Sequence, residues 1–123
     1  MYLFHMKSMV IVLLHTHTHT YIYADCKTKN VLYIIQCNGC NEQYVGETSV
    51  MLKDRMTLHR QHINKPEYRI LGVSKHLKEC GRGHFTVVPF YVLKNPDDDF
   101  RKTKELYFIK KFKPLLNTLH LVS

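Results

Sequence analysis

The stretch from Val31 to Gly46 constrains the fold of this chain more than any other part of the sequence. Residues 31–35 form an unbroken apolar run of β-branched, aliphatic and aromatic side chains, which is typical of a strand buried on both faces. A turn containing asparagine and glycine follows. A second strand then ends at Gly46, where glycine permits a positive φ or the close approach of another backbone. We therefore predict a central strand at about 30–37 and a hairpin partner at about 42–46.

Apolar residues at helical spacing predict two helices after this hairpin. The first runs from about Ser49 to Asn64, with Ser49 as its N-cap. The Lys-Pro-Glu sequence at 65–67 breaks the pattern. A short helix follows and continues until Cys80-Gly81.

The second half of the chain predicts one more strand and one more helix. Phe85 to Leu93 has the composition of a strand, although Pro89 removes a ladder donor and therefore favours an edge strand or a bulge. Asn95-Pro96 and the aspartates at 97–99 precede the last helix. We predict that these aspartates cap its free amides and offset its macrodipole, in preference to binding a metal.

Glu105 has the strongest claim to chemistry in this last helix. Phe108, Ile109 and Phe112 follow it at i+3, i+4 and i+7, so the carboxylate lies on an apolar stripe. Burying an unpaired carboxylate is costly, and the neighbouring lysines project elsewhere. A divalent cation or Arg55 could supply the counter-charge. A purely structural salt bridge to Arg55 is the alternative interpretation.

The first two dozen residues do not resemble the rest of the chain. Residues 9–14 are apolar, and His15 to Thr20 repeat a His-Thr dipeptide three times, as an in-frame CA dinucleotide repeat would encode. A signal peptide and a His-rich metal-binding tract are the alternatives. A transmembrane helix needs about twenty apolar residues, which this segment does not offer. We assign residues 1–24 to a low-complexity extension and residues 25–120 to one domain.

Five landmarks between about residues 30 and 117 resemble, in their order, the GIY-YIG endonuclease family. They are a tyrosine, a tyrosine-aliphatic-glycine motif, an arginine with a histidine four residues later, a glutamate and a final asparagine. In this sequence the landmarks are Tyr33, Tyr44-Val45-Gly46, Arg55 with His59, Glu105 and Asn117. The resemblance implies a metal-dependent endonuclease. It also implies an α/β domain of the α+β kind, in which a small three-stranded, mainly antiparallel sheet is flanked by helices.

The resemblance also implies roles for these residues. Glu105 would hold a single Mg²⁺ or Mn²⁺, hard cations that prefer carboxylate oxygen and polarise a phosphate. Tyr33 would act as the general base or position it, with Tyr44 hydrogen-bonding beside it. Arg55 would lower the pKa of that phenol and contact the scissile phosphate through its planar fork.

Two landmarks remain open between a functional and a structural role. His59 would carry a proton or orient Arg55, and a structural histidine is the alternative. Asn117 would fix the geometry near Tyr33 or the phosphate, and a surface cap is the alternative. Glu47, directly after the glycine of the second motif, is a further residue that could touch the site.

The first motif departs from the family pattern. Val31 and Leu32 stand in place of the usual glycine and isoleucine, and only Tyr33 is kept. Together with the cysteines between the two motifs, this departure resembles the nuclease module of Penelope-like retroelements, which nicks target DNA. A polymerase accompanies the nuclease in those elements and is not present in this sequence. The chain therefore resembles a detached nuclease module or an element remnant.

Cys37 and Cys40 form a C-x-x-C knuckle of the type that holds half of a tetrahedral zinc site. The other ligands are expected downstream: His76 and His84 are the first choice, with His59 and Cys80 as alternates. The Penelope-like resemblance also implies two cysteines paired with two histidines. Unliganded turn cysteines are the main alternative, and a redox motif is less favoured because this knuckle does not cap a helix. Structural disulfides are not expected without a secretory signal.

The charge of the chain agrees with a nucleic-acid partner. The formal net charge is +8 and the pI is about 9.4, and each phosphate neutralised by a cation releases condensed counterions. We expect DNA as the partner and, from that substrate, the nucleus as the location, with no small-molecule cofactor and no membrane. The alternatives are a domain that binds nucleic acid without cutting it and a zinc-stabilised interaction module.

Overall fold

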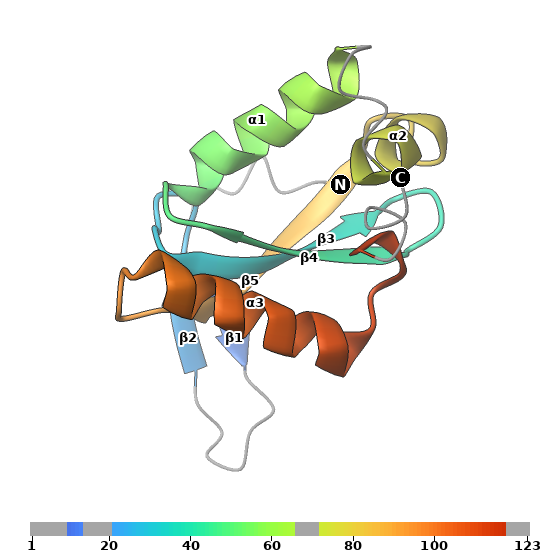
Figure 1. Cartoon of the computed structure of the whole chain (residues 1–123). Helices are drawn as coiled ribbons and strands as arrows, with labels where there is room; N and C mark the ends of the chain where they lie inside the picture. Colours follow the sequence, from blue (N-terminus) through green and yellow to red (C-terminus); the bar gives the residue numbers. More distant parts are fainter. Residues whose placement is uncertain (1–9, 14–20, 66–71, 118–123) are drawn as a thin grey trace.

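A computed structural model describes residues 10–13, 21–65 and 72–117 of the chain. Its centre is a three-stranded antiparallel sheet with helices on both sides (Figure 1). The strand order is β4-β3-β5, with β3 (Val31–Cys37) between β4 (Gln43–Thr48) and β5 (Phe85–Val92). This arrangement confirms the predicted fold class and the predicted central strand.

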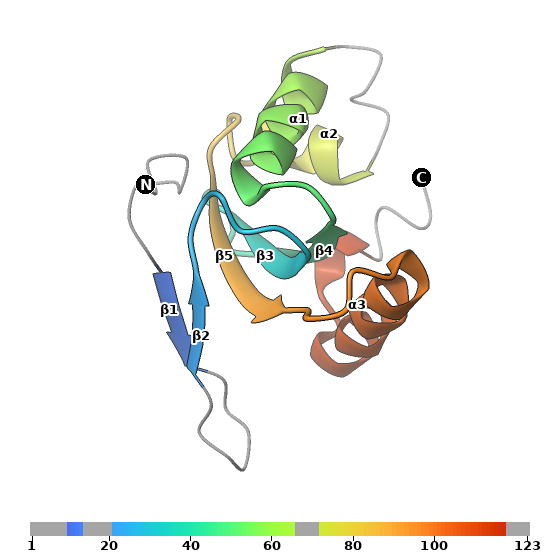
Figure 2. The same cartoon turned by 90° about the vertical axis from the view of Figure 1, so that its left-hand side faces the viewer.

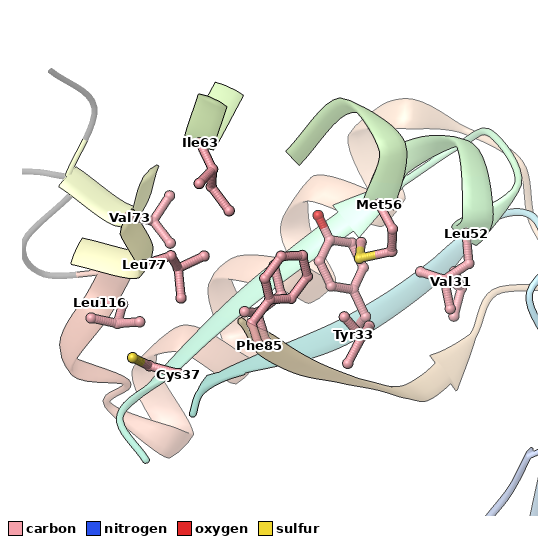
Figure 3. Packing of buried hydrophobic residues seen from close by; sticks show 12 residues of the cluster. Val31, Tyr33, Cys37, Leu52, Met56, Ile63, Val73, Leu77, Phe85 and Leu116 are labelled. Atoms are coloured by element: carbon pink, nitrogen blue, oxygen red, sulfur yellow. The ribbon is translucent and has the colours of Figure 1, made fainter. Parts of the chain in front are cut away.

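Alternate residues of β3 enter two separate cores. Tyr33 and Ile35 belong to the cluster beneath α1 (Leu52–Asn64) and α2 (Gly72–Glu79), which Figure 3 shows from close by. Leu32 and Ile34 pack on the opposite face of the sheet, against side chains of α3 (Asp98–Phe112). Because both faces of β3 are covered, residues 31–35 of the strand form a continuous apolar run with no polar alternation.

Strand β5 contains the irregularity that Pro89 predicts. Tyr33 pairs with Pro89, whereas the preceding Leu32 pairs with Tyr91, so Phe90 is the extra residue of a bulge. Strand β5 is also an edge of this sheet. Both locations tolerate a residue that lacks an N–H group.

Helix α1 begins later than the sequence predicts, and Ser49 is not its N-cap. The N-cap is Met51, which offers no side-chain hydrogen bond. Instead, the carbonyl oxygens of Thr28 and Cys26 accept the amides of Leu52 and Lys53, at 3.0 and 2.7 Å. Backbone groups distant in sequence thus satisfy the free donors that a serine would otherwise cap.

The predicted capping by aspartates at the start of α3 is also wrong in its main detail. Asp97 is the N-cap residue, but its side chain makes no capping hydrogen bond. Asp98 and Asp99 lie in the first turn, where negative charge is favourable to the macrodipole. The Asp98 carboxylate accepts a hydrogen bond from Arg101 at 2.6 Å, so a side chain of the next turn replaces the amides as its partner.

Two short strands lie in the segment that we assigned to the N-terminal extension. Strand β1 (Val10–Leu13) pairs antiparallel with β2 (Tyr21–Ala24), and both contact β5 (Figure 2). The His-Thr repeat at 15–20 and the break at residues 66–67 lie outside the described residues. Within the described part of the chain, no helix has the length and apolar character needed to cross a membrane.

Candidate active site

Tyr33 is the centre of a hydrogen-bonded group under the first helix. Its side chain is fully buried, and its hydroxyl lies 2.8 Å from Nε2 of His59. The Arg55 Nε–H donates to the same hydroxyl oxygen at 3.3 Å. Since Arg55 and His59 are one turn apart on α1, the helix presents both side chains to one phenol.

Gly46 makes room for this phenol on the neighbouring strand. It is the cross-strand partner of Tyr33, and a Cβ atom added at Gly46 would lie 2.6 Å from the Tyr33 hydroxyl. Nearby atoms of the same ring would also be too close. The glycine of the second motif is therefore required by the close approach of the tyrosine of the first.

We expect Gly46→Ala to disturb the site more than an alanine elsewhere in a strand. The ring of Tyr33 would have to move away from Arg55 and His59, and overpacking of this kind costs about 1–3 kcal/mol. Chemical denaturation would measure the stability. A variant with wild-type stability and an unshifted Tyr33 environment would contradict this account.

Tyr44 lies beside the same histidine. The rings of Tyr44 and His59 are 6.1 Å apart, edge to face, and those of Tyr33 and His59 are 5.9 Å apart. Burial and the nearby Glu105 raise the pKa of Tyr44 to about 12, and Arg55 acts in the opposite direction. Burial, together with Tyr44, raises the pKa of Tyr33 well above its ordinary value. Both phenols are therefore protonated in the resting site.

His59 is neutral in this environment. It is 5% exposed, and burial, followed by the charge of Arg55, lowers its pKa to about 3. A neutral imidazole with its proton on Nδ1 accepts at Nε2, and in that tautomer the Tyr33 O–H donates to His59 while its oxygen accepts from Arg55. The arrangement gives the phenol a defined donor and a defined acceptor.

This burial of His59 predicts loss of stability in acid. The folded pKa of about 3 lies below the ordinary value of 6.5, so the unfolded chain takes up a proton first as pH falls. We expect the free energy of unfolding to decrease as pH drops through 6.5 toward 3, and to decrease less in His59→Gln. Urea titrations across this range would measure it, with the less buried His62→Gln as the control. Equal pH dependence of His59→Gln and wild type would contradict the prediction.

Glu105 lies partly buried on α3 and acts on the same residues. Burial, and then the neighbouring Glu47, raise the pKa of Glu105 to about 7, while Lys102 and Arg55 oppose them. Within the described part of the chain Glu105 forms no ion pair, so the alternative of a salt bridge to Arg55 is wrong. The carboxylate is thus desolvated and left without a direct counter-charge.

Asn117 is buried rather than at the surface, so it is not a surface cap. Its side-chain oxygen accepts the Val45 amide at 2.7 Å, and its amide nitrogen donates to the Val45 carbonyl at 2.9 Å. The asparagine thus replaces a missing neighbour on the open edge of β4. It holds the residue between Tyr44 and Gly46 and positions the second motif without contacting Tyr33.

A second group of residues gathers at the other end of β3. One ligand atom from each of Cys37, Cys40, His76 and Cys80 lies within 4.8 Å of every other. The sulfur of Cys40 is 3.2 Å from Nε2 of His76. His84 does not belong to this group, so the first-choice set is corrected to one in which Cys80 replaces His84.

Close backbone packing explains why Cys80 reaches the cluster. A Cβ atom added at Gly39 would lie 2.2 Å from the Cys80 carbonyl oxygen, so the knuckle lies directly against the end of α2. At this point Cys80 follows the last helical turn, with its amide bonded to the His76 carbonyl. His84 comes four residues later, after the turn in which its amide bonds to the Gly81 carbonyl and directly before β5, and its ligand atoms do not join the group.

Two basic residues near the site, Arg101 and Lys102, were not among those that we predicted from the sequence. Arg101 is 4% exposed and is bonded to the carboxylate of Glu47, to which Lys102 also donates at 3.4 Å. Arg101 precedes Glu105 by four residues, and an arginine on the same face as a buried carboxylate is a signal that the sequence contains. Glu47 affects the pKa values of Tyr44, Arg55 and Glu105.

Comparison with known proteins assigns the domain. Residues 29–119 match the family described as the GIY-YIG catalytic domain. None of the curated proteins and none of the solved structures matches the chain. The match covers most of the chain and includes all the residues of the tyrosine site. The chain therefore belongs to the GIY-YIG catalytic domain family, a family of nucleases that use divalent metals.

Proposed function

We propose that this chain is a metal-dependent DNA endonuclease that nicks phosphodiester bonds. The observation that carries the proposal is the site at Tyr33, where Arg55 and His59 share one buried phenol. Burial, and with it Glu105, which forms no ion pair with the residues that the structure describes, raises the pKa of that phenol and of Tyr44. A cation, a proton acceptor and an available carboxylate are what phosphodiester hydrolysis requires.

Each side chain of the tyrosine site has a separate role in the proposed reaction. Arg55 uses Nε for the Tyr33 hydroxyl, and we propose that its terminal nitrogens bind the phosphate under attack. Tyr33 would take up the proton of the attacking water while its own proton passes to His59, whose Nε2 lies 2.8 Å from the hydroxyl. In the resting site burial raises the pKa of Tyr33 and lowers that of His59, so this transfer would need the charge of the divalent cation to lower the pKa of the phenol. We assign the orientation of the attacking water to Tyr44, which is less buried than Tyr33 and whose ring lies edge to face against His59.

Glu105 has the properties of a ligand for Mg²⁺ or Mn²⁺. Hard divalent cations prefer carboxylate oxygen, and the partly buried Glu105, with no ion pair among the described residues, has its oxygens available. When bound, the ion would polarise the phosphate and stabilise the leaving oxygen. Glu105 would hold it beside Arg55, while Glu47 is already occupied by Arg101 and Lys102.

We also propose that Cys37, Cys40, His76 and Cys80 bind a structural zinc ion. Thiolate and imidazole are its preferred ligands, and structural sites use four of them. The four ligand atoms are close enough to surround one ion. A hydrogen bond to Cys40 raises the pKa of the Cys80 thiol to about 11, as expected for sulfurs in contact before an ion displaces their protons. The ion would join the hairpin turn to the end of α2.

The origin and location of the chain follow from the resemblance described above. The cysteine knuckle between the two tyrosine motifs supports a nuclease module derived from a Penelope-like retroelement. A DNA substrate in turn supports action in the nucleus. These two proposals depend on the sequence motifs rather than on the geometry of the site.

Nicking of supercoiled plasmid by the purified full chain would test the proposed function. Reactions with Mg²⁺, with Mn²⁺ and without added divalent cation are compared, and a strong chelator is avoided because it would also remove zinc. Glu105→Gln, purified in parallel, controls for contaminating nuclease. Metal-dependent nicking by the wild type alone supports the proposal. A folded wild type that binds DNA but leaves the plasmid intact would identify a binding module.

A further inference from the structure

A pocket of about 360 Å³ lies beside the tyrosine site, between the end of β4 and the first turns of α1 and α3. Arg55 is one of its lining residues, so the pocket is continuous with the site. It has no role in the chemistry described so far. Its volume exceeds that of one phosphate group and leaves room for the sugar attached to it.

The charges around the pocket leave an excess of cations. The charged lining residues are Glu47, Asp54, Arg55, Arg101 and Lys102. Three of these side chains are cationic and two are anionic. Both oxygens of Glu47 are already engaged, one by Arg101 and the other by Lys102. Asp98 lies outside the lining and offsets part of the charge of Arg101, but it is exposed, so a phosphodiester in the pocket would still meet a lining with more cations than anions.

Arg101 is the residue that most needs such a partner. Its Nε is bonded to Glu47, and its Nη2 donates to Asp98 at 2.6 Å. Its Nη1 is buried and has no hydrogen-bond partner in the described part of the chain. An unsatisfied guanidinium N–H is costly, and a planar guanidinium is well suited to bind phosphate oxygens.

We propose that this pocket binds a phosphate of the nucleic-acid strand next to the bond that is cut, with Arg101 and Lys102 as its ligands. The inference rests on the proposed function, because it names a second phosphate site for the same strand. Arg55 contacts the reacting phosphate, and Arg101 holds the neighbouring one. Two contacts on successive phosphates position the strand against Tyr33 and Glu105.

The alternative hypothesis is that Arg101 only holds Glu47 in place. The two hypotheses predict opposite effects on DNA binding when the Glu47 carboxylate is removed. If Arg101 binds phosphate, Glu47→Gln removes a competing carboxylate and tightens DNA binding. If Arg101 only supports Glu47, then Arg101→Gln and Glu47→Gln weaken the site in the same way.

Binding of a fluorescently labelled DNA duplex, with Ca²⁺ in place of Mg²⁺ to prevent cleavage, is the test. The full-length wild type is compared with Arg101→Gln, Lys102→Gln and Glu47→Gln over a series of salt concentrations. We expect Arg101→Gln to weaken binding about tenfold and to reduce the salt slope by about one. Lys110→Gln, an exposed charge on the same helix outside the pocket, is the matched control.

Each outcome decides the inference. A smaller salt slope for Arg101→Gln and Lys102→Gln, unmatched by Lys110→Gln, supports it, as does tighter binding by Glu47→Gln. Equal effects of all three cation variants, or weaker binding by Glu47→Gln, overturn it. If Arg101→Gln does not fold, the DNA binding of Lys102→Gln, at an exposed residue, and of Glu47→Gln still tests the inference. Failure of the wild type to nick plasmid overturns the proposed function separately, since that assay needs no variant of the pocket.

Discussion

Glu105→Gln is expected to abolish cleavage and leave the protein folded. If this carboxylate holds the catalytic ion, its loss removes several kcal/mol of transition-state stabilisation, which corresponds to a rate loss of at least about 10³-fold. Glutamine has nearly the same shape and keeps the packing of α3. Plasmid nicking under single-turnover conditions would measure the rate.

The stability of Glu105→Gln distinguishes a functional role of Glu105 from a structural one. The pKa of Glu105 is raised to about 7 by burial, so ionisation of this group opposes folding, and the folded state loses stability as pH rises through that value. A neutral glutamine removes this cost. We therefore expect Glu105→Gln to be as stable as the wild type, or more stable, at neutral and higher pH.

Glu42→Gln provides the matched control, because it makes the same chemical change at a partly exposed residue directly before β4 that has no part in the proposed mechanism. It should retain wild-type cleavage. A Glu105→Gln variant that cleaves normally would remove the residue from the mechanism. A variant that loses cleavage only because it unfolds would assign the residue a structural role.

Cys80→Ser is expected to lower zinc content and stability, whereas His84→Gln is expected to change neither. Serine is a poor zinc ligand, so the variant loses an ion that binds only the folded state. An ion present at a few hundred times its Kd stabilises the folded state by about 3 kcal/mol, and losing it is a drop in Tm of roughly 12–24 °C for a domain of this size. Elemental analysis of the purified proteins and thermal unfolding would measure both quantities.

This pair of variants also separates the two ligand sets. The sequence alone favours His84 as the fourth ligand, and the structure favours Cys80. Zinc lost in His84→Gln and retained in Cys80→Ser would restore the histidine set. Wild-type protein that contains no zinc and is insensitive to both changes would leave the four residues without a metal role.

Much of the architecture could be predicted because burial leaves a local pattern. The apolar run of β3 requires a strand covered on both faces, and Pro89 requires an edge or a bulge. Helix starts were less predictable. The amides of Leu52 and Lys53 find carbonyl partners more than twenty residues earlier in the chain, so no local signal marks the N-cap.

In the candidate site, too, some features follow from local sequence and others depend on tertiary packing. Arg55 and His59 are one helical turn apart, so their common face follows from local geometry, and Glu105 lies on an apolar stripe that the sequence displays. The contact between Arg101 and Glu47 joins residues 54 positions apart. It depends on how α3 packs against β4, which periodicity does not specify.

By itself, the sequence of this protein determined the central strand, the tyrosine and glycine landmarks and the cysteine knuckle, because burial, turns and motif spacing are local properties. Only the tertiary structure decided the fourth ligand of the cysteine cluster, the role of Asn117 as a clamp on Val45, and the pocket beside Arg101. Each of these depends on the packing of one element against another. Cys80 and His84 are equally suitable ligands in sequence, but they lie on either side of one backbone turn, and only Cys80 joins the cysteines of the knuckle.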